Sequence, residues 1–256
     1  LYGWRVAYNV LAGFAITMTP IIVLLLRSDP SKMKLDPDDE DDIPKKKITS
    51  NTNENWKIQK VIASPAFWLL VLAAVGSIGP VRMLTVHQIA LMVDAGYERS
   101  LAALVVGFAG GITALSFVLS GALSDRINRQ TVFLAGSISL LFAMFILNGL
   151  QSNLKGTIWL ILYAVFLGVG EGSRSSMVTA VASDLFPGNA LGAIIGTIGA
   201  AFGLGAAFFP WLAGWLFDQQ GTYTIGFMIA SIGIIISTKS LFLSTKFENR
   251  PQQKGV

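Results

Sequence analysis

Long apolar stretches separated by short polar turns dominate the chain. A helix needs about 20 apolar residues to cross the hydrocarbon core of a bilayer, and seven stretches meet that length. They are 6–26, 66–93, 101–123, 131–150, 157–182, 190–217 and 222–244. None of them alternates apolar and polar residues with the period of two that a transmembrane β-strand requires. The pattern predicts an all-α integral membrane protein with seven transmembrane helices.

The polar segment between the first two stretches holds almost half of the charge. Eight basic and eight acidic residues fall between Arg27 and Lys60, together with three prolines. High charge and proline with few apolar residues are typical of a disordered linker. We expect residues 28–64 to form such a linker, joining a single helix in residues 1–27 to a six-helix domain in residues 65–256.

Composition narrows the function classes. Only 13% of the 256 residues are charged and 53% are apolar, whereas soluble domains carry about 25% charged residues. Outside the linker, charge is too sparse for a water-soluble surface, which excludes a soluble enzyme and a nucleic-acid-binding module. The chain has no cysteine, which excludes a disulfide scaffold and a metal site with thiolate ligands. We expect no catalytic residue, no metal and no cofactor.

The distribution of Lys and Arg predicts the orientation. If the linker is cytoplasmic, fourteen of the 19 basic residues lie on the cytoplasmic side and three lie outside. Such an excess is the mark of the cytoplasmic side. We expect a multi-pass protein of the plasma or inner membrane, with the linker and the C-terminus in the cytoplasm.

Glycines recur inside three of the stretches. Small residues three or four apart let helices approach closely in lipid, and glycine-rich helices also bend during transport; the sequence leaves both roles open. The glycines are Gly107, Gly110, Gly111, Gly168, Gly170, Gly172, Gly192, Gly196, Gly199, Gly203 and Gly205.

A charged turn follows the third stretch. Asp125 can accept N–H bonds near a helix start or pair with an arginine. Asn128 stands where the chain turns, and asparagine tolerates the left-handed conformation. Gly121 leaves room for a neighbouring helix. Standing alone, the turn could be no more than a basic loop that fixes orientation.

The turn resembles the signature G-x-L-x-D-R-x-G-R-R of the major facilitator superfamily. The matching residues are Gly121, Leu123, Asp125, Arg126 and Arg129. Asn128 replaces the last glycine of the pattern, and Gln130 replaces its last basic residue. The family carries this signature between the second and third helices of each six-helix half, which is its position here after the linker.

Other segments extend the resemblance to almost the whole chain outside the linker. Residues 3–30 resemble the family's sixth helix with the start of its central loop, and residues 182–188 resemble the turn after the tenth helix. Residues 202–218 resemble the eleventh helix, and residues 221–223 resemble the start of the twelfth. They are closest to the monocarboxylate and oxalate–formate transporter-like branch. The resemblance implies the sixth helix, the central loop and the second half, built from two inverted three-helix repeats, with the N-terminal helices of the same protein as a partner. We therefore expect a fragment of a longer protein.

Four of the titratable side chains inside the stretches are candidates for a site: Arg82, His87, Glu171 and Arg174. A charge at the bilayer centre costs about 2.5–3.5 kcal/mol on insertion scales, and such residues usually serve a function. Glu171 and Arg174 share one helix face, either as a self-neutralising structural pair or with Arg174 on an anionic substrate and Glu171 exchanging protons. Arg82 follows Gly79 and Pro80, which suggest a bent or broken helix. It either contacts the anion or reaches the interface. His87 is an interfacial side chain or a proton relay.

We expect a secondary active transporter that moves a small organic anion, such as a monocarboxylate, by alternating access coupled to protons or exchange. The substrate and ion site would comprise Arg82, Glu171, Arg174 and His87, and the gate Gly121, Asp125, Arg126, Asn128 and Arg129. No phosphate-binding loop for ATP occurs. The partners are the solute, protons and the lipid bilayer.

Two alternatives stay open. The same fold could export drugs or amphipathic solutes, because the third and sixth stretches lack a positive charge mid-span. The chain could also be a truncated half-transporter without activity of its own.

Overall fold

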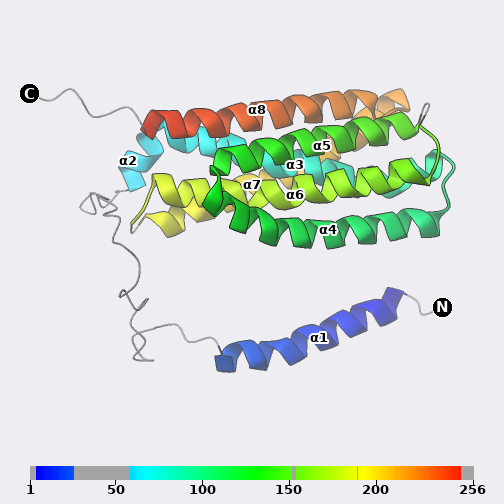
Figure 1. The fold of residues 1–256 in the computed structure, drawn as a ribbon, viewed down its shortest axis with the longest axis horizontal. Coiled ribbons are helices and arrows are strands. Elements are labelled where there is room, and N and C mark those ends of the chain that lie inside the picture. Colours follow the sequence, from blue (N-terminus) through cyan, green and yellow to red (C-terminus); the bar gives the residue numbers. More distant parts are fainter. Residues whose placement is uncertain (1–3, 26–57, 152–153, 189, 249–256) are drawn as a thin grey trace, which may run out of the picture. The chain divides into compact units, whose positions relative to one another are not determined.

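A computed structural model describes residues 4–25, 58–151, 154–188 and 190–248, and within them the chain forms helices and short turns. The helices are α1 (Trp4–Leu25), α2 (Ile58–Ala63), α3 (Pro65–Asp94), α4 (Arg99–Arg126), α5 (Arg129–Leu150), α6 (Thr157–Leu185), α7 (Leu191–Gln220) and α8 (Thr224–Glu248) (Figure 1). The chain divides into two units, Leu1–Thr52 and Asn53–Val256.

Each predicted apolar stretch coincides with one long helix, within a few residues at either end. Within the part of the chain that the structure describes, five helices are long and apolar enough to cross a membrane: α3, α4, α5, α7 and α8. Helix α6 has 29 residues, but Glu171 and Arg174 lower its hydropathy. An all-helical membrane architecture is therefore supported, whereas the count of seven spans stays a prediction.

Helix α1 belongs to the first unit. Its 22 residues include Pro20 and no charge beyond the first turn. Thr17 Oγ1 donates to the carbonyl oxygens of Gly13 at 3.1 Å and Phe14 at 2.9 Å, so its hydroxyl is satisfied within the helix. This local pairing suits a hydroxyl in an apolar helix.

Helix α2 differs from the predicted linker, because residues 58–63 are helical. Val61 is fully buried, and the Trp68 indole donates to the Ile62 carbonyl oxygen at 2.9 Å. Apolar residues at 58, 61 and 62 give this end of the segment a helical stripe. Residues 28–57 of the predicted linker lie outside the described residues.

Helices α3 to α8 form a bundle in which the six helices run alongside one another (Figure 1). The most extensive helix pairs are α3–α7, α4–α6, α5–α6 and α3–α8. Exchanging α3, α4 and α5 for α6, α7 and α8 reproduces this set, since α3–α7 becomes α6–α4 and α3–α8 becomes α6–α5. Helices α3 and α6 are the central members, while α4 and α7 are mostly exposed.

The apolar core is divided into two clusters. One contains Leu84, Leu147 and Tyr163, and the other contains Phe67, Phe133 and Val178. Between them lies a belt of buried polar side chains from four helices. The belt comprises Ser77, Ser137, Ser139, Ser173, Arg174, Ser237 and Ser240. We call this set the polar belt; it lies about midway along the bundle, where hydroxyls must find partners inside the protein.

Glycines fall into two groups by what surrounds them. A Cβ at Gly168 or Gly172 would lie 2.8 Å from the Ala109 carbonyl oxygen or 2.6 Å from that of Thr113, so these glycines let α6 approach α4. Gly170 does the same toward α5, and Gly205 toward α3. The others have nothing within 4 Å of that position: Gly107, Gly110, Gly111, Gly192, Gly196, Gly199 and Gly203. Close packing inside the bundle thus accounts for only the first group.

Two glycines on α7 make a matched test of this division. A Cβ at Gly205 would lie 2.5 Å from the Val75 carbonyl oxygen, whereas Gly203 faces open space. Because backbone cannot move aside like a side chain, Gly205→Ala is expected to destabilise the protein by about 1–3 kcal/mol. In the 256-residue chain, where nothing described lies near that position, Gly203→Ala gains up to about 1 kcal/mol of helix propensity. Thermal unfolding in detergent measures both, and equal melting temperatures would contradict the packing.

Candidate functional site

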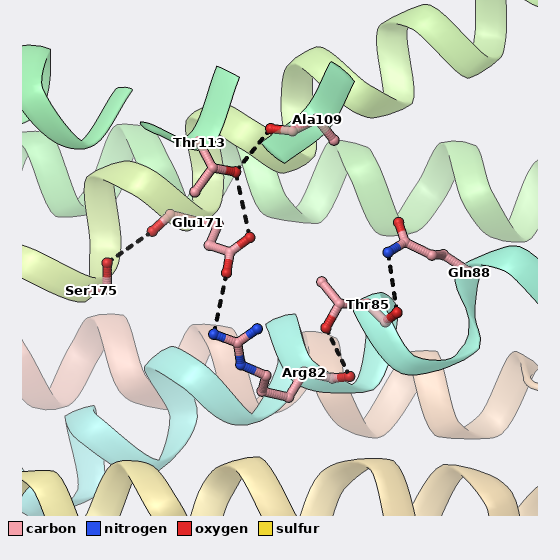
Figure 2. A network of polar contacts seen from close by, with 7 residues as sticks. All are labelled: Arg82, Thr85, Gln88, Ala109, Thr113, Glu171 and Ser175. Carbon is pink, nitrogen blue, oxygen red and sulfur yellow. Dashed lines mark hydrogen bonds and ion pairs between the residues drawn. The ribbon is translucent and has the colours of Figure 1, made fainter. Parts of the chain in front are cut away.

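Helices α3 and α6 bring two oppositely charged side chains together. Arg82 Nη2 lies 3.5 Å from Glu171 Oε1. The Arg82 side chain is 45% exposed and that of Glu171 is 17% exposed. Thr113 on α4 donates to Glu171 Oε2 at 3.5 Å. Figure 2 shows the carboxylate held between the guanidinium on one side and this hydroxyl on the other.

Local hydrogen bonds stabilise the backbone around this site. Thr85 Oγ1 donates to the Arg82 carbonyl oxygen at 3.2 Å, and Ser175 Oγ donates to that of Glu171 at 3.3 Å. Thr113 Oγ1 also reaches the Ala109 carbonyl oxygen at 3.0 Å (Figure 2). Three helices therefore contribute one side chain each to this candidate site, and the guanidinium is half-exposed beside an acid that is mostly buried.

Arg174 lies in the polar belt and does not pair with Glu171. Its side chain is 1% exposed. Nη1 donates to Ser137 Oγ, and Nη2 donates to the Gly76 carbonyl oxygen at 3.0 Å and to Ser237 Oγ at 3.1 Å. The shared helix face predicted from spacing therefore gives no ion pair: Glu171 pairs with Arg82 of α3, whereas Arg174 donates to uncharged oxygens of α3, α5 and α8.

The Arg174 guanidinium also stacks over an aromatic ring. Its central carbon lies 4.4 Å from the centroid of Phe133. The acceptors around it are two hydroxyls and one carbonyl, which accept hydrogen bonds from the guanidinium but do not neutralise its charge. Arg174 Nε has no hydrogen-bond partner among the described residues. No atom of this group is open to a solute in this conformation.

His87 joins α3 to α7 and to the start of α8. Its Nε2 lies 3.1 Å from the Pro210 carbonyl oxygen, and its Nδ1 lies 3.2 Å from the Tyr223 hydroxyl. A carbonyl only accepts, so Nε2 carries a hydrogen. The imidazole and phenol ring centroids are 5.0 Å apart. Among the described residues, no contact joins His87 to Arg82 or Glu171.

The signature turn forms the junction between α4 and α5. Asn128 has φ −65° and ψ 138°, which is extended backbone, so the expected left-handed conformation is wrong. Residues at the N-cap position adopt this region, and the Asn128 carbonyl oxygen accepts from the Thr131 and Val132 N–H groups. Asp125 lies in the last turn of α4, not at a helix start. A Cβ at Gly121 would meet open space.

An ion pair links this turn to the end of α6. Arg129 Nε lies 3.1 Å from Asp184 Oδ2. Asp184 stands two residues beyond the fifth apolar stretch. Burial raises its pKa, and the Arg129 guanidinium opposes the shift. Both side chains are partly exposed, so the pair contributes up to about 1 kcal/mol. Asp125 and Arg126 are exposed and form no ion pair within the described residues.

Sequence reasoning missed Thr113, Asp184 and the two serines that contact Arg174. Asp184 had a usable signal, since it is an acid at the end of a stretch that finishes on the same side as Arg129. The hydroxyls had none, because serine and threonine are common in membrane helices and local sequence does not tell which of them face a charge.

Comparison with known proteins assigns the chain to a family. The model of the Major Facilitator Superfamily matches residues 1–155 and 149–256. Over 161 residues, 58% of this chain, the sequence is 26% identical to the multidrug transporter protein MdtP of Bacillus subtilis (strain 168), covering 28% of that protein. Over 162 residues, 61% of this chain, it is 25% identical to monocarboxylate transporter 12-B of Danio rerio, covering 33%.

The matched region thus spans about a third or less of each relative. Both relatives are named as transporters, and the family model covers essentially all of the chain. Together with five helices among the described residues that are long and apolar enough to cross a bilayer, this indicates a multi-pass membrane protein. The chain belongs to the major facilitator superfamily.

Proposed function

We propose that the protein is a secondary active transporter of a small organic anion, with a monocarboxylate as the substrate class and protons as the coupling ion. The observation that carries this proposal is the ion pair between Arg82 and Glu171, which joins two different helices at a half-exposed position. The planar guanidinium group suits a carboxylate, and the carboxylate of Glu171 already contacts the guanidinium of Arg82.

The pair provides a mechanism for coupling. Without substrate, Arg82 and Thr113 both contact the carboxylate of Glu171, which neutralises Arg82. When Glu171 takes up a proton, it releases Arg82, which then binds the carboxylate of the substrate. The site carries no net charge in either state, so both states cross the low-dielectric interior without an uncompensated charge. Anion and proton therefore travel together.

Arg174 and His87 receive other roles in this proposal. Arg174 has 1% of its side chain exposed and three oxygen acceptors, so anion contact is assigned to Arg82. His87 bridges the Pro210 carbonyl and the Tyr223 hydroxyl. It stabilises one end of the bundle and takes no part in the proton step.

The surrounding architecture is proposed as seven transmembrane helices. Residues 1–27 form the last helix of the first half, residues 28–64 form the linker, and residues 65–256 form the transport domain. The exchange of helix pairs between α3–α5 and α6–α8 supports two inverted repeats with the site between them. The open glycine faces of α4 and α7 suit close packing by the N-terminal helices. The linker and C-terminus are proposed to be cytoplasmic.

The turn between α4 and α5 is proposed as the gate, formed by Gly121, Asp125, Arg126, Asn128 and Arg129. Its contact with α6 through Arg129 and Asp184 supports a role in conformational change. Asp125→Ala is expected to lower the maximal uptake rate while KM for the substrate changes less than about twofold, as expected for a gating step. A raised KM with a normal maximal rate contradicts this assignment.

Efflux of amphipathic drugs is the second candidate, favoured by the similarity to the Bacillus multidrug transporter. The two functions separate in one experiment: the complete protein in proteoliposomes is given a panel of monocarboxylates and a panel of lipophilic cations. The proposal predicts proton-dependent uptake of the first panel only. Transport of the cations alone overturns it in favour of efflux.

A further inference from the structure

Pro80 leaves an acceptor without its normal donor in α3. In an α-helix the N–H of residue 80 would donate to the carbonyl oxygen of Gly76, four residues earlier, and proline has no N–H. Both residues lie inside the continuous helix α3 and both are buried. An unsatisfied carbonyl in a membrane interior is costly, so another group must supply the hydrogen bond.

Arg174 of α6 supplies it. Nη2 donates to the Gly76 carbonyl oxygen at 3.0 Å. The space around this contact is tight, because a Cβ at Gly76 would lie 2.7 Å from the Gly233 carbonyl oxygen and one at Gly136 would lie 3.1 Å from Arg174 Cγ. These glycines let α8 and α5 close around the contact, so the position of the guanidinium is fixed.

The other contacts of Arg174 extend this connection across the bundle. Ser237 Oγ accepts from Nη2 at 3.1 Å and itself donates to the Ala73 carbonyl oxygen at 2.7 Å. Ser137 Oγ accepts from Nη1 and from Thr238 Oγ1. A single guanidinium therefore connects α6 to α3, α5 and α8, which a shorter side chain could not do.

We propose that Arg174 is a positioning residue: its guanidinium replaces the backbone hydrogen bond that Pro80 removes from α3 and holds this part of α3 against α6, so that Arg82 meets Glu171. Arg82 follows Pro80 by two residues, and Glu171 precedes Arg174 by three, so the structural contact lies close in sequence to both members of the functional pair. The inference rests on the proposed function for its consequence, but the contact itself is tested without transport.

These 256 residues contain no cysteine, so labels can be placed at chosen positions in them; any cysteine elsewhere in the complete protein is first replaced by serine. Spin labels on Val86→Cys of α3 and Val169→Cys of α6, both exposed positions, report the distance between the two helices by pulsed electron paramagnetic resonance. In the complete protein we expect one narrow distance distribution, and Arg174→Gln is expected to broaden or shift it. Adding Pro80→Ala returns an N–H to Gly76 and should restore the narrow distribution.

The matched control is Pro210→Ala, which returns an N–H to α7 instead and should not restore the distribution. An unchanged distribution in Arg174→Gln overturns the proposal, and so does restoration by Pro210→Ala. If Arg174→Gln does not fold, the same comparison is made on the yield of folded protein: recovery with Pro80→Ala supports the proposal, and failure to recover overturns it.

Transport adds a second readout. Misplacement of Arg82 is expected to raise KM for the anion about tenfold to hundredfold, with a smaller change in maximal rate, and Arg174→Lys should recover part of the loss. If the parent protein carries no anion, the proposed function fails while the spin-label result still decides the role of Arg174. If the parent protein takes up the anion but the distance between the labels on α3 and α6 is the same in Arg174→Gln as in the parent, only the positioning role fails.

Discussion

Replacing Arg82 by glutamine is expected to lower the ratio of maximal uptake rate to KM for a monocarboxylate about hundredfold or more. In the occluded protein, Arg82 and the bound substrate carboxylate would form a desolvated, hydrogen-bonded charge pair, and truncating one partner of such a pair costs about 2–5 kcal/mol. A tenfold change in affinity corresponds to about 1.4 kcal/mol. Arg82 is the half-exposed member of the pair with Glu171, so it is the guanidinium that a solute can reach.

Initial rates of uptake in proteoliposomes of the complete protein measure this effect. Arg82→Lys keeps the charge but loses the planar fork, and it should recover only part of the activity. Arg99→Gln is the control: it removes the same charge from an exposed position at the start of α4 and should transport normally. An Arg82→Gln protein with normal uptake would remove Arg82 from the substrate site.

Glu171→Gln is expected to uncouple transport from protons. Glutamine resembles the protonated carboxyl, so Arg82 is permanently released and Thr113 keeps an oxygen partner. The variant should still exchange labelled for unlabelled anion, and its rate should not respond to pH. The parent rate should fall up to about tenfold per pH unit on the alkaline side, as for a step that requires one bound proton.

Exchange and net uptake at several pH values separate these outcomes. Glu98→Gln removes an acid just before α4, at an exposed position, and should keep the pH dependence of the parent. If Glu171→Gln also keeps that dependence, another group carries the proton. If the variant loses exchange together with net uptake, Glu171 contributes to anion binding in a way that the coupling scheme does not include.

Hydropathy located the long helices but not the short one. Apolar runs of membrane length can only be satisfied as helices in lipid, so α3, α4, α5, α7 and α8 follow from the sequence. The six residues of α2 lie next to a highly charged segment, where the local composition outweighed their weak helical stripe. The structure also separates Gly205 from Gly203, because close approach depends on the neighbouring helix and not on glycine spacing.

The site was predictable as a set of residues but not as a set of pairs. The cost of membrane-embedded charge singles out Arg82, Glu171 and Arg174 from sequence alone. Spacing within a helix favoured Glu171 with Arg174, whereas the actual partner of Glu171 comes from α3. Helix α6 is central in the bundle and has other helices on several sides. Its own sequence therefore does not indicate which of these helices its charged side chains contact.

The central claim is that one site carries an anion and a proton together, and the movement of the proton tests it most directly. Proteoliposomes of the complete protein are loaded with a pH-sensitive dye and given an inward monocarboxylate gradient without a pH gradient. The account predicts that the lumen acidifies at a rate well above that of protein-free vesicles, and that both Arg82→Gln and Glu171→Gln reduce acidification to the protein-free rate. Uptake of the labelled anion by the parent protein without acidification above the protein-free rate would contradict the account.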